Sequence, residues 1–169
     1  LSADVGWLDG VVYTHSHADH VHGIDDLRMI VFNRKSRLPV WADAETSDAL
    51  IIRFGYAFVH PAGSPYPPIL DLHGISGPFE VPGAGGAIGF TPFQVSHGGI
   101  SALGFRVADL VYLPDVSEIP DAAWDHLRDL KLWILDALRY KPHPTHAHLE
   151  RSLDWIAPAK PDAAILTNM

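Results

Sequence analysis

The chain has 169 residues, 47% of them hydrophobic, which is enough to bury one sizeable core, so we expect a single domain over residues 1–169. A formal net charge of −8 argues against a general nucleic-acid surface, which would be basic, and no apolar run is long enough to cross a bilayer. The chain has no cysteine, which excludes a disulfide framework and thiolate metal ligands and suits a cytoplasmic protein.

The first distinctive feature is a histidine-rich motif that follows a short apolar run. Residues 11–13 predict a buried strand, and His15, His17, Asp19 and His20 come directly after it. In extended backbone, side chains two apart point the same way, so His15 and His17 can converge on one point. If the chain then turns, Asp19 and His20 can reach a second point close by. Imidazole and carboxylate suit zinc and similar divalent ions, so the motif predicts a metal site with two ions.

The next segments alternate between helix and strand. Apolar spacing predicts a helix over residues 24–32, residues 33–37 form a basic loop, and residues 39–42 favour a strand. A second helix is expected over residues 45–54, ended by Gly55. The basic loop is read as a solvated turn, with contact to an anionic substrate as the alternative. The alternation indicates an α/β or layered α+β domain.

Two proline- and glycine-rich segments separate this region from the next strand. Residues 60–68 predict a rigid surface loop, and residues 82–86 predict a turn. Residues 88–95 alternate in the manner of a strand, which leads into His97 and a glycine. A histidine at a strand end is a second place where the chain offers a metal ligand.

The remaining segments are expected to be short strands with one short helix among them. Residues 103–107 and 110–113 predict a hairpin that leads to Asp115, which is read either as a metal ligand or as a turn-forming or helix-capping residue. A short helix is expected over residues 120–127, and the last strand over residues 163–166.

A third group of chemically capable residues follows the predicted strand at 132–135. Asp136 ends that strand, where it either orients a ligating histidine or is simply buried and hydrogen-bonded. Thr145 can cap a helix that runs to about residue 156, which would place His146 and His148 in its first turn. Both are read as site residues, with surface histidines as the alternative.

The motif at residues 15–28, His-Ser-His-Ala-Asp-His-Val-His-Gly-Ile-Asp-Asp-Leu-Arg with its flanking residues, resembles the signature of the metallo-β-lactamase superfamily. It looks most like the phosphodiesterase branch, which contains PhnP-type cyclic phosphodiesterases and ribonuclease Z relatives, and the resemblance extends over nearly the whole chain. It implies an α+β fold, the αββα sandwich of two sheets flanked by helices. Leu1 is not an initiator methionine, and the strands that the family usually has before the motif are largely missing. Members of the family also carry a histidine right after the last strand, where this sequence ends at Met169, so we expect the domain to be truncated at both ends.

The resemblance also implies the roles of the site residues. Two divalent ions, Zn²⁺ or Mn²⁺, are expected: His15, His17 and His97 on one, Asp19 and His20 on the other, and Asp115 between them. His146 is the expected proton donor, Asp19 is assigned to catalysis as well as to metal binding, and Asp136 and His148 are expected to orient a ligand or contact the substrate.

The reaction that the resemblance implies is attack of a metal-activated hydroxide on the phosphorus of a small, and in one variant cyclic, phosphodiester or nucleotide. Carboxyl-ester or lactone hydrolysis would use the same hydroxide and stays an alternative. Ribonuclease Z activity shares the ligands, but the extended tRNA-gripping arm and basic surface that it needs are not visible in this sequence. A metal-binding domain without activity is the non-enzymatic alternative. No membrane partner is expected, and a homodimer is compatible with the sequence.

Overall fold

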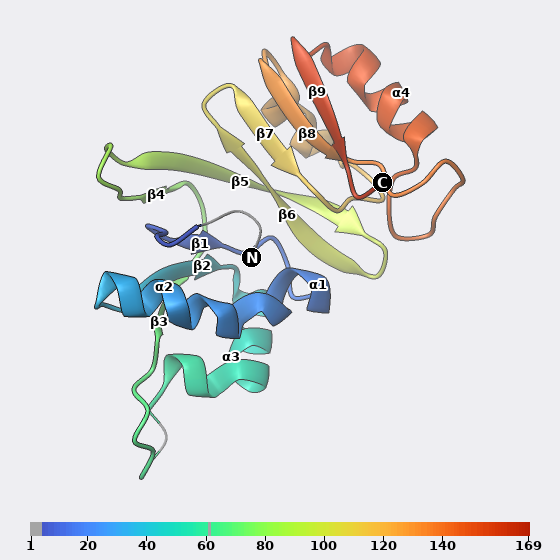
Figure 1. The fold of residues 1–169 in the computed structure, drawn as a ribbon. Coiled ribbons are helices and arrows are strands. Elements are labelled where there is room, and N and C mark those ends of the chain that lie inside the picture. The colour runs from blue at the N-terminus through green and yellow to red at the C-terminus, as the bar shows by residue number, and fades with distance from the viewer. Residues whose placement is uncertain (1–4, 61) are drawn as a thin grey trace. The chain divides into compact units, whose positions relative to one another are not determined.

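The computed structural model describes residues 5–60 and 62–169, and its backbone forms two compact units (Figure 1). The first unit runs to Ser76 and includes Val81–Ala87, and the second comprises Gly77–Glu80 and Ile88–Met169. The expectation of a single domain stays a prediction.

The first unit contains a three-stranded parallel sheet in the order β1-β2-β3, with helices packed against it (Figure 1). Its elements in chain order are β1 (Val11–Val12), α1 (Ala18–Val21), the 3₁₀ helix η1 (His22–Asp26), α2 (Leu27–Arg34), β2 (Leu38–Ala42), α3 (Ala44–Phe58) and β3 (Leu70–Gly74). Parallel neighbours need crossover connections, and α2 and α3 lie in two of these connections.

The core of the first unit lies between the sheet and the helices α2 and α3. Val40 and Leu70 of the sheet are buried with Ile30 of α2 and with Leu50 and Phe58 of α3. Strands buried in this way are rich in apolar residues, because a parallel sheet has helices over its face. This packing holds the end of β1, where the histidine-rich motif begins.

Helix α3 continues past the residue at which the sequence predicted its end. Gly55 lies inside the helix, which runs from Ala44 to Phe58 with a kink at Phe54 (φ −130°, ψ 29°). Ala57 and Phe58 are buried in the core of the first unit. Glycine inside a helix costs about 1 kcal/mol relative to alanine, and burial of one further turn of apolar side chains offsets that cost. The predicted end at Gly55 thus coincides with this kink, and one further helical turn follows it.

The second unit contains a six-stranded mixed sheet in the order β4-β5-β6-β7-β8-β9 (Figure 1). Its elements are β4 (Phe79–Val81), β5 (Ile88–His97), β6 (Ile100–Val107), β7 (Leu110–Leu113), the 3₁₀ helix η2 (Asp121–Leu127), β8 (Leu132–Asp136), α4 (Leu149–Ala159) and β9 (Ala163–Thr167). Strands β5 to β7 are antiparallel hairpins, whereas β7, β8 and β9 are parallel and are joined through η2 and α4. The parallel arrangement brings the ends of β7, β8 and β9 to one edge of the sheet.

Helices η2 and α4 pack on the core of this sheet. Trp133, Leu113 and Leu135 are fully buried, Leu127 of η2 joins them, and Trp155 of α4 packs against the cluster. The strands predicted at residues 11–13, 39–42, 88–95, 110–113, 132–135 and 163–166 are present within one or two residues. Strands β3 and β4 were not predicted, and the helix predicted over residues 24–32 becomes regular only at Leu27. Among the helices of the described residues, none is long and apolar enough to span a membrane.

Candidate metal centre

The first unit brings three histidines together just after β1. The rings of His15 and His17 lie 4.7 Å apart between centroids, and those of His15 and His20 lie 4.3 Å apart. His15 is 1% exposed, and its Nδ1 lies 3.0 Å from the hydroxyl of Thr14. This contact orients the imidazole, and hydrogen bonds of this kind are typical of histidines that bind metal ions.

The turn that the motif required occurs at His17. This residue is extended (φ −64°, ψ 152°) and stands directly before α1, which carries Asp19 and His20. The Asp19 carboxylate lies 3.6 Å from Nε2 of His20, and its side chain is 77% exposed. The segment after β1 and the helix that follows it thus present two pairs of ligand-type side chains from six residues.

The second unit brings His97 and Asp115 together from two different strand ends. Nε2 of His97 lies 3.4 Å from Oδ2 of Asp115, and both residues are 2% exposed. The other ring nitrogen, Nδ1, lies 2.7 Å from the carbonyl of Thr145, to which it must donate its proton. In the neutral tautomer, therefore, the lone pair of Nε2 faces a carboxylate, and two such groups are attracted to each other only through a proton or a cation.

Asn168 connects Asp115 to the neighbouring carboxylate of Asp136. Its side-chain amide donates to Asp115 Oδ1 at 2.9 Å, to the carbonyl of Pro114 at 2.8 Å and, more weakly, to Asp136 Oδ1 at 3.3 Å. Asn168 follows β9 in the left-handed conformation (φ 68°), which asparagine adopts more readily than most residues. The amide thus fixes the orientation of both carboxylates at the edge where β7, β8 and β9 end.

Asp136 in turn holds His146. Its Oδ2 lies 2.9 Å from Nδ1 of His146 and also accepts from the backbone amides of Val116 at 3.1 Å and Ala147 at 3.3 Å. Burial raises the pKa of Asp136, while its bond to the Val116 amide and the nearby His146 act in the opposite direction. The Asp136–His146 contact leaves Nε2 of His146 for other partners, an arrangement that suits a histidine that transfers protons.

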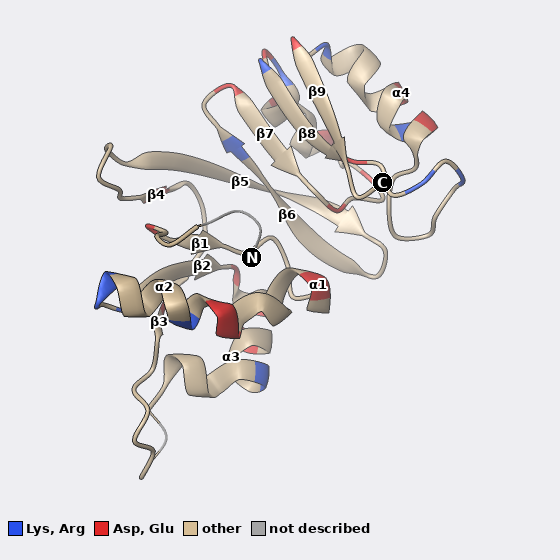
Figure 2. Cartoon of the chain, in the orientation of Figure 1, with Lys and Arg blue, Asp and Glu red and all other residues tan. Residues whose placement is uncertain are grey.

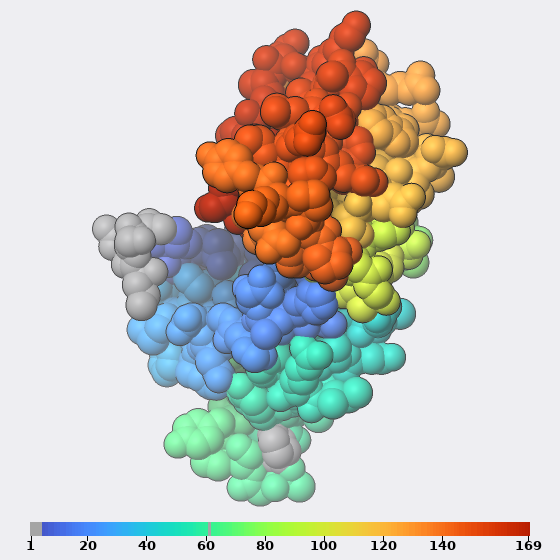
Figure 3. All heavy atoms as spheres, turned by 90° about the vertical axis from the view of Figure 1, so that its right-hand side faces the viewer, coloured from blue at the N-terminus to red at the C-terminus, as the bar shows by residue number. Residues whose placement is uncertain are grey.

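His146 lies in a surface loop, over residues 139–146 of the second unit (orange in Figure 3). Arg139 closes this loop by donating to the carbonyls of Lys141 at 3.0 Å and Pro142 at 2.5 Å. On the other side, a Cβ at Gly98 (φ 63°) would lie 2.9 Å from Cβ of Thr145, so only glycine fits beneath the loop.

The helix predicted to begin at Thr145 begins at Leu149 instead, so its predicted start was wrong. The Thr145 carbonyl accepts from His97, and its hydroxyl lies 3.3 Å from Nδ1 of His143, so the residue is engaged in the loop rather than in a cap. His148 occupies the N-cap position without a side-chain capping bond. The carbonyl oxygen of His148 accepts hydrogen bonds from the hydroxyl and the backbone amide of Ser152.

The sequence did not predict several residues that position the site. Thr14, Gly98, Thr145, Asn168 and Arg139 each position a predicted site residue or the loop that carries it. Glycine directly after His97 and asparagine directly after the last strand were the available signals. Their partners lie far away in the sequence, so neither signal identified a contact.

The donor sets fit a divalent metal ion. Each unit supplies imidazole and carboxylate groups, which bind zinc and manganese and need no cysteine. Ligand-type atoms of His15 and His17, of Asp19 and His20, and of His97 and Asp115 approach within 4.8 Å pair by pair. The hydrogen bonds of His97 Nδ1 to a carbonyl and of Asp115 to an amide are the kind that orient metal ligands. The chain therefore carries His/Asp clusters able to bind metal.

Comparison with known proteins gives the class of this fold and site. The model of a family described as a beta-lactamase superfamily domain matches residues 1–169. The structure of a new diphosphatase from the PhnP family aligns with a TM-score of 0.83 and 35% identity over 97% of this chain and 61% of that one. YhfI from Bacillus subtilis, a metallo-β-lactamase fold protein, aligns with a TM-score of 0.72 and 18% identity over 95% of this chain and 64% of that one.

The chain belongs to the metallo-β-lactamase superfamily, in which it falls in the PhnP-like branch, and it has the α+β fold of that superfamily. A curated relative from Porphyromonas gingivalis, named an octanoyltransferase, is 34% identical over 161 residues, which are 92% of this chain and 31% of that protein. The chain thus spans about a third of this relative and less than two thirds of both solved structures.

Proposed function

We propose that this chain is a metal-dependent hydrolase of phosphoric esters that uses two divalent ions. In this proposal His15, His17 and His97 hold one ion, Asp19 and His20 hold the other, and Asp115 bridges them. The observation that carries it is the fixed tautomer of His97, whose Nδ1 donates to Thr145 while Nε2 faces Asp115 at 3.4 Å. That arrangement supports a ligand role more strongly than a structural one.

Two ions bound there, zinc or manganese, would supply a hydroxide nucleophile near neutral pH and neutralise charge on the substrate. The residues of the chain have separate tasks. Asp19 and Asp115 offset only part of the charge of two dications, so the centre favours an anionic substrate. His146, which Asp136 orients through Nδ1, would give a proton from Nε2 to the leaving oxygen.

The substrate class that we favour is a small phosphodiester, cyclic or linear, or a nucleotide. A diphosphate is the second candidate, because the solved structure with 35% identity is that of a diphosphatase. Both are attacked at phosphorus and both carry negative charge, so the same residues would act on either. The name octanoyltransferase belongs to a protein of which this chain matches 31%, so the chain's function does not follow from that name.

Hydrolysis assays with three probes test the proposal. Bis(p-nitrophenyl) phosphate reports on phosphodiesters, a dinucleoside diphosphate on phosphoanhydrides, and a lactone on carbonyl chemistry, each assayed with added Zn²⁺ or Mn²⁺. We expect cleavage at phosphorus that a chelator abolishes. Lactone hydrolysis alone would replace the proposal with the carbonyl alternative, and metal binding without any hydrolysis would support a metal-binding domain.

A cytoplasmic location, the absence of a membrane or general nucleic-acid partner and a homodimeric assembly complete the proposal. Fractionation of cells that express the native protein, together with light scattering of the purified chain, would test them. Protein recovered with membranes would contradict the first of these points.

A further inference from the structure

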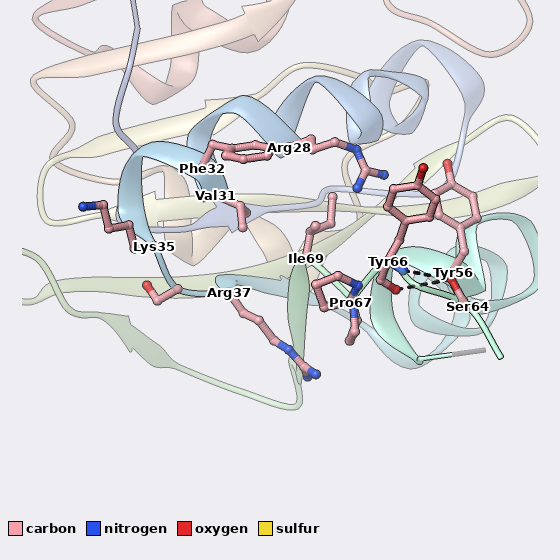
Figure 4. A pocket seen from close by; sticks show the side chains of 12 residues that line it. Arg28, Val31, Phe32, Lys35, Arg37, Tyr56, Ser64, Tyr66, Pro67 and Ile69 are labelled. Carbon is pink, nitrogen blue, oxygen red and sulfur yellow. Dashed lines mark hydrogen bonds between the residues drawn. The ribbon is translucent and has the colours of Figure 1, made fainter. Parts of the chain in front are cut away.

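A second candidate ligand site lies in the first unit, in a pocket of about 830 Å³ to which none of the clustered histidines contributes (Figure 4). Its walls come from α2, the turn after α2, α3 and the segment before β3. Its volume falls in the range of small-molecule sites, about 300–1,000 Å³. None of the residues that line the pocket is a proposed ligand of the metal centre, so the two sites are made of different side chains.

The lining is predominantly apolar and aromatic. Phe32 on α2 is 70% exposed and Tyr66 is 71% exposed. Both line the pocket, so a ligand bound in it would cover them. Val31 and Ile69 provide aliphatic surface between them. Exposed aromatic rings that face one concave surface are typical of a ligand site, whereas single exposed apolar residues need no explanation.

The wall at the tyrosine end of the pocket is held in place by hydrogen bonds. Asp25 accepts from the hydroxyl of Tyr56 at 2.8 Å and from Arg28 at 3.5 Å, which joins α3 to α2. In the proline-rich segment before β3, the Ser64 hydroxyl accepts from the Tyr66 amide at 3.2 Å. A pocket with constrained walls is preformed, which lowers the cost of binding.

The pocket has cationic residues along its length, but the cation without a carboxylate partner among the described residues lies at its other end. Arg28 and Arg37 line the pocket, but each is paired with a carboxylate, Asp25 at 3.5 Å and Asp71 at 3.1 Å. Lys35, the left-handed residue that ends α2 (φ 57°), has no carboxylate within 4.0 Å among the described residues. Figure 2 shows the positive charge at this end of α2. The pocket therefore carries about one uncompensated positive charge.

The cation and the aromatic end are separated along the pocket. In Figure 4, Lys35 lies at one end and Tyr56 and Tyr66 lie at the other, with Phe32, Val31 and Ile69 between them. Arg28 and Lys35, both lining residues, are seven positions apart on α2, which corresponds to about 10 Å. We propose that this pocket binds an amphipathic organic monoanion, a carboxylate with a medium-length hydrocarbon body, whose head meets Lys35 and whose body lies along the apolar wall.

The test compares two probes of the same chain length, decanoate and decyltrimethylammonium, below their micellar concentrations. Binding to the isotope-labelled chain is followed by two-dimensional NMR, which also locates it. We expect decanoate to perturb the amides of residues 28–37 and 64–69, and the cationic probe to bind at least tenfold more weakly.

Two variants and two matched controls locate the binding. Lys35→Glu and Phe32→Ser should each raise the Kd for decanoate about tenfold or more, the loss expected for about 1.4 kcal/mol. Lys160→Glu changes a lysine in the same left-handed position at the end of α4, and Ile52→Ser changes an 83% exposed residue of α3 outside the pocket. Both controls should bind within twofold of the parent chain.

Equal Kd values for the two probes, an unchanged Kd in both Lys35→Glu and Phe32→Ser, perturbations confined to other segments, or no binding of decanoate would each overturn the proposal. Hydrolysis of phosphoric esters is not involved in any of these measurements, so this inference stands or fails separately from the proposed function.

Discussion

Nδ1 of His97 lies 2.7 Å from the carbonyl oxygen of Thr145, which is 48 residues further along the chain. This one hydrogen bond fixes the tautomer of a buried histidine and holds the surface loop that carries His146. The proposed metal ligand and the proposed proton donor are thus positioned through the same backbone group. Changes to the loop should therefore affect metal binding and proton transfer together.

Gly98 provides the first prediction. In Gly98→Ala, the new methyl group would overlap Thr145 in a left-handed conformation, which costs about 1–2 kcal/mol for the backbone and about 1–3 kcal/mol for overpacking. We expect the free energy of unfolding to fall and the affinity for metal to fall with it, as measured by denaturant unfolding and metal titration. Gly99→Ala is the control, because a Cβ there meets nothing within 4 Å. Equal effects of the two substitutions would show that the loop does not depend on Gly98.

Asn168 provides the second prediction. Asn168→Ala removes the amide that orients Asp115 and Asp136, so we expect a loss of about 1–3 kcal/mol in stability and about 10–100-fold in metal affinity. Asn168→Asp should restore neither the stability nor the metal affinity, because an ionised carboxylate cannot donate a hydrogen bond to Asp115 or Asp136. Asn33→Ala, which removes an exposed amide bonded to the Gly6 carbonyl at 2.7 Å, is the control for stability. Unchanged metal affinity in Asn168→Ala would refute the orienting role.

The third prediction concerns the proposed metal ligands. His17→Ala and Asp115→Ala each remove one of them, so each should lower the number of bound ions and abolish hydrolysis, with the fold retained. Elemental analysis after dialysis measures the metal, and circular dichroism measures the fold. His22→Ala, which alters a histidine directly after α1, should behave like the parent chain. Full metal content in Asp115→Ala would remove its assignment as the bridge.

The fourth prediction concerns His146. A proton donor matters most when the leaving group is a poor one, and general acids contribute about 10²–10⁴-fold. His146→Ala should therefore slow hydrolysis of alkyl phosphodiesters far more than that of p-nitrophenyl esters. Asp136→Asn, which alters the residue that orients His146, should likewise slow the alkyl esters more than the p-nitrophenyl esters. His60→Ala, an exposed histidine bonded to the Ser64 carbonyl, is the control. Equal losses with both substrates would indicate a binding or structural role.

The fifth prediction concerns pH and the pair Lys131–Asp109, whose charged atoms lie 2.6 Å apart. The hydrogen bond from Lys131 lowers the pKa of Asp109 in the folded chain. A lowered carboxyl pKa contributes stability above the pKa of the unfolded chain, and this contribution is lost as pH falls through the folded pKa. Lys131→Met should raise the pKa of Asp109 and remove this acid-dependent part of the stability. An NMR titration of the Asp109 carboxyl measures the shift, and an unchanged pKa would contradict the role of Lys131.

The amino-acid sequence alone determined those features that depend on residues close to one another. The histidine motif was recognisable because alternate side chains of an extended strand share one face, and a turn after His17 brings Asp19 and His20 near. Most strands were predictable because their apolar runs and alternation reflect burial of each strand by itself. The family could be inferred for the same reason, since its signature is a local pattern.

Only the tertiary structure decided the features that depend on distant residues. Asn168 bonds with Asp115, 53 positions earlier, and no local pattern records that pairing. Helix α3 passes Gly55 because Ala57 and Phe58 are buried against elements elsewhere in the first unit. The helix predicted from Thr145 starts at Leu149 because the Thr145 carbonyl is bonded to His97. In each case the packing and hydrogen bonds supplied by distant segments outweighed local preference, and these interactions exist only once the chain is folded.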